Sequence, residues 1–294
     1  MKTQKGLLLF ILFTLIYSGK LYSQIPIVDN PKYTKYYDVV DKWIMVSRTV
    51  ADTVSETSFN CGFIFIDPDK GFFLQIDGQF DIDNNGNYIM GKPMDISEKF
   101  KYPIGHNWAH VDTISQDKRK ELDLPEHPSW LKFYKKDENE PSYKLKIATV
   151  YNRVGAYKKS LPILTSLYDA DPNMDGLAVE LSHLYKAARE YDKIITLMES
   201  AMKVNPENPA YYSALGHALL KTGKPDEAES FYRKGIELSD DKGLKGSMAF
   251  DMVTVYFDKK DKEKFNEWYA IAKASFEKDS LYDKILEDFK SRIN

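Results

Sequence analysis

The chain has one cysteine, no apolar run long enough to span a bilayer and no excess of basic charge. Because Cys61 is alone, an internal disulfide is excluded, and its place in the strand-like run FNCGFIFID favours a buried thiol. The longest apolar stretch, Leu7 to Tyr17, has eleven residues including Thr14, whereas a membrane-spanning helix needs roughly 20. The 41 basic and 44 acidic residues give a net charge of -3, so neither a nucleic acid nor an anionic membrane is expected as a partner.

Motifs that carry common enzymatic chemistry are also missing. The sequence contains no phosphate-binding loop, dinucleotide fingerprint or serine elbow. The stretch that begins DIDNNG at Asp81 resembles the start of a calcium-binding loop, but its twelfth position is Lys92 where a bidentate Glu is required. We therefore interpret it as a hairpin turn.

One group of histidines has a spacing that zinc sites use. His106 and His110 are four residues apart, which suits two zinc ligands on a helix, and His127 or Asp112 could add a third. The Gly- and Pro-rich context favours a loop with solvated histidines instead. The prediction is no metal, no cofactor and no catalytic residue.

The first 23 residues have the three parts of a secretory signal peptide. Lys2 and Lys5 precede the apolar run, and small or polar residues around Ser18 and Ser23 follow it. We expect cleavage after Ser23, with an uncleaved anchor as the alternative. The predicted location is therefore outside the inner membrane, periplasmic or secreted.

Residues 24–134 are predicted to form a small antiparallel β-rich domain. Short runs of β-branched and aromatic residues alternate there with turn signals. The predicted strands are 42–50, 58–67, 71–77 and 87–91. The segments DPDKG and DNNGN, at 67–71 and 83–87, read as hairpin turns, so we expect a meander from residue 43 to residue 90.

After a charged linker at 135–143, the apolar pattern becomes helical and repeats every 34 residues. Pro172 and Pro206 are separated by this step, as are Tyr151 and Tyr185. A period of 34 with this pattern resembles the tetratricopeptide repeat (TPR), in which each unit is a pair of antiparallel helices.

The resemblance implies three clear units and one divergent unit in residues 135–294. The clear units begin at residues 141, 175 and 209, and small residues such as Gly216 stand where the two helices of a unit come closest. The fourth unit requires a three-residue insertion around DDKGLKG, at 240–246. A C-terminal helix with Asp283 and Glu287 on its polar outer face is expected to cap the stack. The predicted fold class is therefore α+β, a β-rich domain followed by an all-α solenoid.

The resemblance also implies that the first helix of each unit lines a concave groove. The ninth positions of the four units carry Thr and His, where TPR proteins that hold a C-terminal carboxylate have Asn, so that type of recognition is not expected. The predicted groove residues are Thr149, Asn152, Arg153, His183, Lys186, His217, Lys221, Asp251, Thr254 and Asp258.

These features together predict an exported scaffold that binds a protein or peptide partner without catalysis. One alternative is an envelope enzyme whose β-rich domain carries the activity, with His106, His110 and His127 as the first residues to test, and whose repeats recruit substrate. Another is a structural subunit of an envelope complex. No insertion into a membrane is expected after the signal segment is removed.

Overall fold

The structure is a computed structural model that describes residues 35–50, 53–91, 101–105 and 112–293. Its chain divides into two compact units, residues 28–180 and residues 181–294. The predicted signal segment lies outside the described residues.

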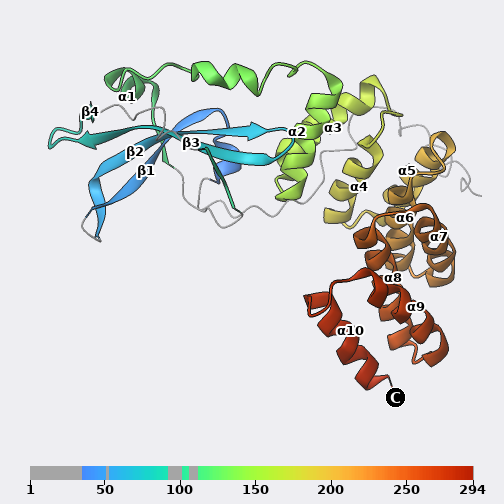
Figure 1. The fold of residues 1–294 in the computed structure, drawn as a ribbon. Helices are drawn as coiled ribbons and strands as arrows, with labels where there is room; N and C mark the ends of the chain where they lie inside the picture. The colour runs from blue at the N-terminus through green and yellow to red at the C-terminus, as the bar shows by residue number, and fades with distance from the viewer. Residues whose placement is uncertain (1–34, 51–52, 92–100, 106–111, 294) are drawn as a thin grey trace, which may run out of the picture. The chain divides into compact units, whose positions relative to one another are not determined.

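Six strands of the described residues form one antiparallel sheet (Figure 1). The strand order is β4-β3-β2-β1-β6, and β5 pairs with β3. The predicted meander is therefore confirmed. The strands are β1 Lys42–Val50, β2 Thr53–Asp67, β3 Gly71–Ile82, β4 Tyr88–Met90, β5 Lys101–Pro103 and β6 Asp112–Thr113. Three short helices accompany them: η1 Tyr36–Asp38, α1 Gln116–Glu121 and η3 Ser129–Phe133.

Two strands are longer than their sequence patterns indicated. β2 begins at Thr53, five residues before the predicted start, because Thr53 pairs with Val50 at the end of β1. β3 continues to Ile82 because its last three residues pair with β4. The joining turn is a hairpin turn, as predicted, in which the Asp83 carboxylate accepts hydrogen bonds from the backbone N–H groups of Asn85 and Asn87, both at 2.8 Å.

Both faces of the sheet are covered, which explains why β2 reads as a nearly continuous apolar run. Alternate residues point to opposite faces. Ile64 and Ile66 pack on one face in a cluster with Tyr36, whereas Phe63 and Phe65 pack on the other. The second face also buries the thiol of Cys61, so the prediction of a buried free cysteine is confirmed. Its other members include Trp43, Phe80, Ile114, Leu122 and Leu131.

The first helical pair, α2 Pro141–Arg153 and α3 Tyr157–Ala170, shares a core with the sheet. Val150 of α2 is buried in the same cluster as Ile64, and the Tyr151 ring lies 5.7 Å from the Phe72 ring. This pair therefore belongs to the compact unit of residues 28–180. The boundary predicted between residues 134 and 135 stays a prediction.

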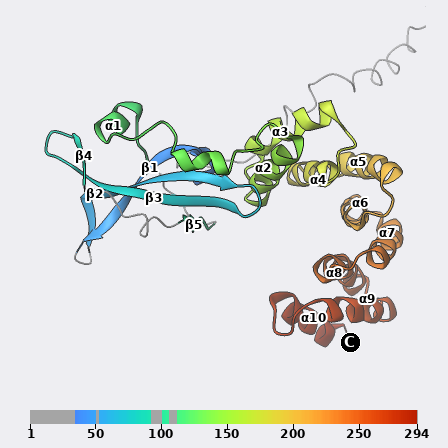
Figure 2. The same ribbon diagram turned by 45° about the horizontal axis from the view of Figure 1, so that its top comes forward.

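The later helices continue the pairs (Figure 2), and their order confirms the predicted fold class. They are α4 Leu177–Ala187, α5 Tyr191–Val204, α6 Pro209–Lys221, α7 Pro225–Leu238, α8 Lys242–Asp258, α9 Lys262–Ser275 and α10 Leu281–Arg292. The divergent fourth unit is the pair α8 and α9. α8 has 17 residues, whereas α6 has 13, so the extra residues lengthen a helix by about one turn and leave the pair intact.

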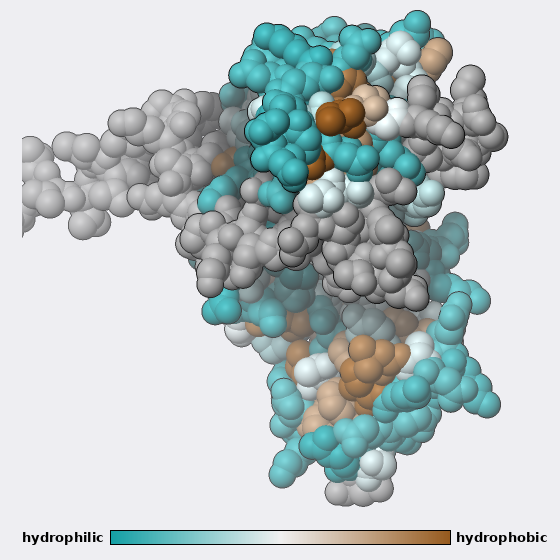
Figure 3. All heavy atoms as spheres, turned by 90° about the vertical axis from the view of Figure 1, so that its left-hand side faces the viewer, coloured by the Kyte–Doolittle hydropathy of each residue, from teal (hydrophilic) through white to brown (hydrophobic). Residues whose placement is uncertain are grey.

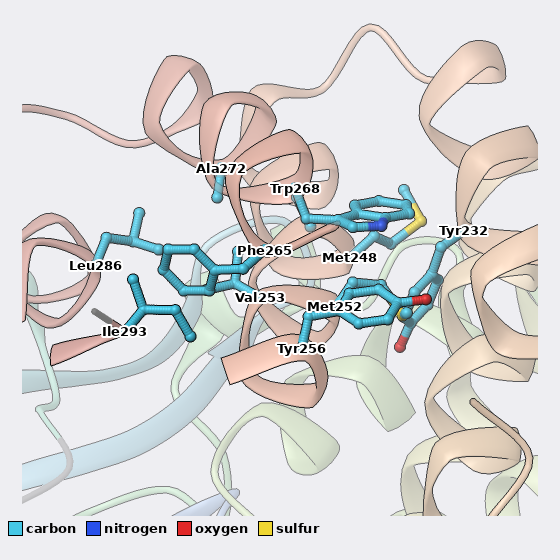
Figure 4. Close-up of a cluster of buried hydrophobic side chains, with 11 residues drawn as sticks. Tyr232, Met248, Met252, Val253, Tyr256, Phe265, Trp268, Ala272, Leu286 and Ile293 are labelled. Carbon is cyan, nitrogen blue, oxygen red and sulfur yellow. The ribbon is translucent and has the colours of Figure 1, made fainter. Parts of the chain in front are cut away.

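The unit of residues 181–294 has a core in which aromatic rings and methionines interdigitate (Figure 4). Trp268 and Phe265 of α9 pack with Met248 and Met252 of α8, and all four are buried. Leu286 of α10 joins them, which closes the C-terminal end of the stack. Buried aromatic side chains contribute most of the apolar area here.

One residue of the capping helix differs from expectation. Asp283, predicted on the polar outer face, is buried. The reason is local capping: Ser280 is the N-cap residue of α10, and its hydroxyl oxygen accepts a hydrogen bond from the backbone N–H of Asp283, while Lys273 of α9 contacts the Asp283 carboxylate. Glu287 remains exposed as predicted.

A buried carboxylate on α7 joins three helices. Glu229 Oε1 accepts a hydrogen bond of 2.6 Å from Arg233 Nη2, and Oε2 accepts one of 2.9 Å from Lys264 Nζ on α9. The Tyr256 hydroxyl of α8 donates to Oε2 as well. Burial alone would raise the pKa of Glu229, but these hydrogen bonds outweigh it and lower the pKa to about 2.

We predict that Gly216→Ala destabilises the protein, although Gly to Ala inside a helix normally stabilises by about 1 kcal/mol. An added Cβ would lie 2.3 Å from Cε1 of Tyr232, and the Tyr232 hydroxyl is held by Asp251. Gly216→Leu is expected to cost about 1–3 kcal/mol in a urea titration. Lys221→Leu, at an exposed position of the same helix, is the control. An unchanged unfolding midpoint for Gly216→Leu would contradict the close packing of α6 on α7.

The Glu229 network predicts an acid-sensitive contribution to stability. Because the folded pKa lies below the ordinary value of 4.5, the contribution is complete above about pH 5 and is lost as the pH falls from 4.5 toward 2. Glu229→Gln should cost about 1–3 kcal/mol at pH 7 and clearly less at pH 3. Glu267→Gln, which removes the exposed partner of Arg233, is the control. If the stability difference between the wild type and Glu229→Gln is the same at pH 7 and at pH 3, the proposed ionised state of Glu229 is refuted.

Candidate partner-binding groove

Side chains from the first helices of successive repeats meet in the compact part of residues 181–294. Nδ1 of His217 on α6 lies 3.1 Å from Oδ2 of Asp251 on α8. The Tyr232 hydroxyl on α7 donates to the same oxygen at 2.6 Å. The side chains of His217 and Asp251 are 22% and 31% exposed, so the pair is held by the core and still reaches the surface.

The charge of Asp251 is stabilised by groups from three helices. Its burial would raise the pKa, but hydrogen bonds from His217 and Tyr232 and the charge of Lys186 on α4 hold the pKa below its ordinary value. The carboxylate is therefore ionised at neutral pH. Lys186, His217 and Asp251 come from α4, α6 and α8, so the first helices of three successive units present polar groups to one region.

The fourth repeat keeps the 34-residue period at Asp251. Asp251 follows His217 by 34 residues and contacts it, whereas Thr254, predicted at the matching position, donates its hydroxyl to the Phe250 carbonyl of its own helix at 3.0 Å. Measured from this pair, the extra length of α8 relative to α6 lies mainly after Asp251, not at the predicted insertion in 240–246. Sequence reasoning placed Asp251 in the groove by its charge, and the hydrogen bond to His217 was visible only in the structure.

Other predicted groove residues of this unit are exposed. His183 and Lys186 lie on α4, and Lys221 and Asp258 lie at the ends of α6 and α8. The predicted groove residues of α4, α6 and α8 form a row along the first helices of the repeats. In this row, Lys186 and Lys221 add positive charge at the middle, and Asp258 adds negative charge toward the C-terminal end. Their assignment to a binding surface stays a prediction.

In the unit of residues 28–180, Asn152 has a structural role. It is buried, and its amide nitrogen donates to the Glu180 carboxylate at 2.7 Å and to the Glu180 carbonyl at 3.0 Å. Its amide oxygen accepts a 2.5 Å hydrogen bond from the Ser160 hydroxyl. Thr149 donates to a carbonyl within α2, and Arg153 is exposed. Asn152 therefore holds α2, α3 and α4 together.

Aromatic rings add an apolar surface that the sequence analysis missed. Phe257 of α8 stacks on Phe289 of α10 with ring centroids 4.4 Å apart, and Phe250 packs against Tyr282 at 5.2 Å. Tyr282 and Leu281 are 48% and 72% exposed, and Figure 3 shows hydrophobic residues gathered among hydrophilic ones on the C-terminal helices. Phe250 and Phe257 are seven residues apart in α8, and this spacing is the sequence feature that could have predicted the apolar surface.

Metal and membrane features are absent from the part of the chain that the structure describes. No group of three or more His, Cys, Asp and Glu side chains in it could hold a metal ion. His106 and His110, whose spacing suits zinc, lie outside the described residues. None of the described helices combines the length and apolar character that crossing a membrane requires.

Comparison with known proteins agrees with the paired helices and their spacing. Residues 185–244 match the tetratricopeptide repeat family. Residues 185–244 thus contain tetratricopeptide repeats, in a chain whose N-terminal region forms an antiparallel sheet. TPR repeats imply a scaffold for protein–protein interaction, generally without catalysis, and the N-terminal sheet has no assigned role.

Similar proteins include anaphase-promoting complex subunit 3 of Schizosaccharomyces pombe, which is 24% identical over 136 residues. That match covers 46% of this chain and 20% of the relative, so the chain spans about a fifth of its length. A thermophilic TPR protein of Thermus thermophilus has 18% identity and a TM-score of 0.47, over 53% of this chain and 84% of that one. The PilF structure of Pseudomonas aeruginosa has 14% identity and a TM-score of 0.43, over 53% and 74%.

The His217–Asp251 contact predicts a measurable effect on stability. His217→Ala leaves the half-buried carboxylate with one donor fewer, so it should cost about 0.5–1.5 kcal/mol in urea unfolding and leave the circular dichroism spectrum unchanged. Lys221→Ala, at an exposed position of the same helix, should change stability by less than about 0.5 kcal/mol. If His217→Ala unfolds at the wild-type midpoint, the contact does not hold α6 to α8.

Proposed function

We propose that this protein is an exported scaffold that binds a protein or peptide partner along the first helices of its repeats, without catalysis. The observation that supports this most directly is the convergence of Lys186, His217 and Asp251 from α4, α6 and α8. A row of polar groups on rigid helices is a suitable surface for an extended peptide or a helix.

The charges in this row favour a partner that carries both signs. Lys186 and Lys221 would contact acidic groups of the partner, while Asp251 and Asp258 would contact basic groups nearer the C-terminal end. Because Asp251 is fixed by hydrogen bonds from His217 and Tyr232, it is oriented before binding and loses little side-chain entropy when a partner binds.

The groove is tested with a photoreactive benzoylphenylalanine placed singly at Lys186 or Lys221. These two positions should cross-link the same partner species, and excess unmodified protein should compete. Matched controls carry the same residue at Lys203 of α5 or Lys234 of α7, which are exposed on the second helices. Equal cross-linking from Lys203 and Lys234 would contradict binding along the first helices.

Export is tested separately, by the N-terminus of the protein recovered outside the inner membrane. We expect that it begins at Gln24, because residues 1–23 have the parts of a signal peptide. A chain expressed without residues 1–23 should stay in the cytoplasm. A protein that retains Met1 and remains inside the cell would refute export while leaving the groove proposal intact.

A further inference from the structure

A cavity of about 440 Å³ lies within the unit of residues 28–180. Its walls come from the segment before β1, from β2, from the turn after η3 and from the helices α2 and α3, so it sits where the sheet meets the first helical pair. Ile66, Ile147 and Ile163 supply apolar wall. Its volume falls in the range of roughly 300–1,000 Å³ that is typical of small-molecule sites.

Two hydroxyl groups in the cavity wall have no partner among the described residues. Tyr143 and Tyr151 of α2 line the cavity, and neither hydroxyl makes a hydrogen bond within that part of the chain. Asp41 also lines it: one carboxylate oxygen pairs with Lys135, and the other is buried without a hydrogen-bond partner. Buried polar atoms are normally satisfied, so the unpaired Asp41 oxygen indicates a donor group of a ligand, and the two half-buried hydroxyls beside it offer further contacts.

Burial and nearby carboxylates act on the two tyrosines of the cavity wall. Burial, followed by the charges of Asp41, Glu138 and Asp67, raises the pKa of Tyr143 to about 12. The pKa of Tyr151 is raised to about 12 by burial and by the carboxylates of Asp41 and Asp38. Burial and nearby negative charges oppose the loss of a phenolic proton, so both phenols stay neutral and their oxygens can accept a hydrogen bond.

The charged groups of the lining are two lysines and two carboxylates. The Lys135 ammonium is paired with one oxygen of Asp41, and Lys144 and Glu138 are both exposed to solvent, where their charges are screened. The second oxygen of Asp41 is the charged group of the lining that lacks a hydrogen-bond partner among the described residues. Because a carboxylate oxygen only accepts hydrogen bonds, it favours a ligand that donates them.

We propose that this cavity binds a primary ammonium group carried on an apolar stem, the chemistry shared by a lysine side chain and a free alkylamine. The stem packs against Ile66, Ile147 and Ile163. The ammonium donates to the Tyr143 and Tyr151 hydroxyl oxygens, in the negative field of Asp41. This site shares no residue with the row that includes His217 and Asp251 and is independent of the proposed scaffold function.

The proposal is tested by titrating the full chain with hexylamine, hexanol and hexanoate, which share a six-carbon stem and differ in charge. Calorimetry or ligand-observed NMR should detect saturable binding of hexylamine, binding of hexanol that is at least about tenfold weaker, and none of hexanoate. Equal binding of all three, or preferred binding of hexanoate, overturns the proposal.

Variants locate the site. The double variant Tyr143→Phe/Tyr151→Phe and the single variant Asp41→Asn should each weaken hexylamine binding by about tenfold or more. Tyr168→Phe makes the same change on α3 outside the cavity lining and should bind as the wild type does. Unfolding curves check that each variant is folded, and Tyr143→Phe alone serves if the double variant is not. Unchanged hexylamine binding in folded cavity variants overturns the assignment.

The source of the ammonium is separated by a second probe, Nα-acetyl-lysine N-methylamide. Tighter binding of this lysine derivative than of hexylamine indicates that the site takes a side chain of a protein. Tighter binding of hexylamine indicates a free amine. Blocking the ammonium as Nε-acetyl should abolish binding of the lysine derivative, and retained binding of the blocked compound would refute recognition of the charge.

Discussion

The close approach of α6 and α7 at Gly216 is the contact on which the C-terminal unit depends. There is no room for a Cβ between Gly216 and the Tyr232 ring. The ring is therefore fixed by packing, and its hydroxyl is aimed at Asp251 of the next helix pair. Asp251 in turn meets His217, which stands beside Gly216 in the sequence. Gly216 thus sets the distance between the two helices of one repeat. It also orients the polar groups that join this repeat to the next repeat.

The same combination of dense packing and satisfied polar groups occurs along the repeats. Asn152 and Ser160 connect the first helices through buried hydrogen bonds, and Glu229 connects α7, α8 and α9 through Arg233, Tyr256 and Lys264. Each network is anchored in the core and supplied with donors, so its charge or amide group is compensated. Such networks specify which helices are neighbours, whereas apolar packing alone tolerates several arrangements.

The surfaces proposed for binding in the two units differ in chemistry. The row from Lys186 to Asp251 is open and mixed in charge, which suits an extended partner. The cavity lined by Tyr143 and Tyr151 is enclosed by both sheet and helices, and it exists because α2 packs on the sheet instead of standing free of it. A β-rich segment that shares a core with the first repeat therefore provides a cavity that a repeat array by itself would not contain.

The repeat architecture could be predicted from the sequence because its signals are local. Pro172 and Pro206 mark the ends of units, Gly216 marks a close helix contact, and the Asn-Gly pair marks the turn after β3, each by backbone chemistry that acts within a few residues. Sequence alone could not show that Asn152 is buried against Glu180, that Asp283 is a buried capping partner, or that Asp251 contacts His217. It also did not reveal the cavity, whose walls come from segments about 125 residues apart along the chain, between Val40 and Ser166. Burial, hydrogen-bond partners and cavities are properties of contacts between distant segments, and these contacts are decided by how the sheet and the helices pack.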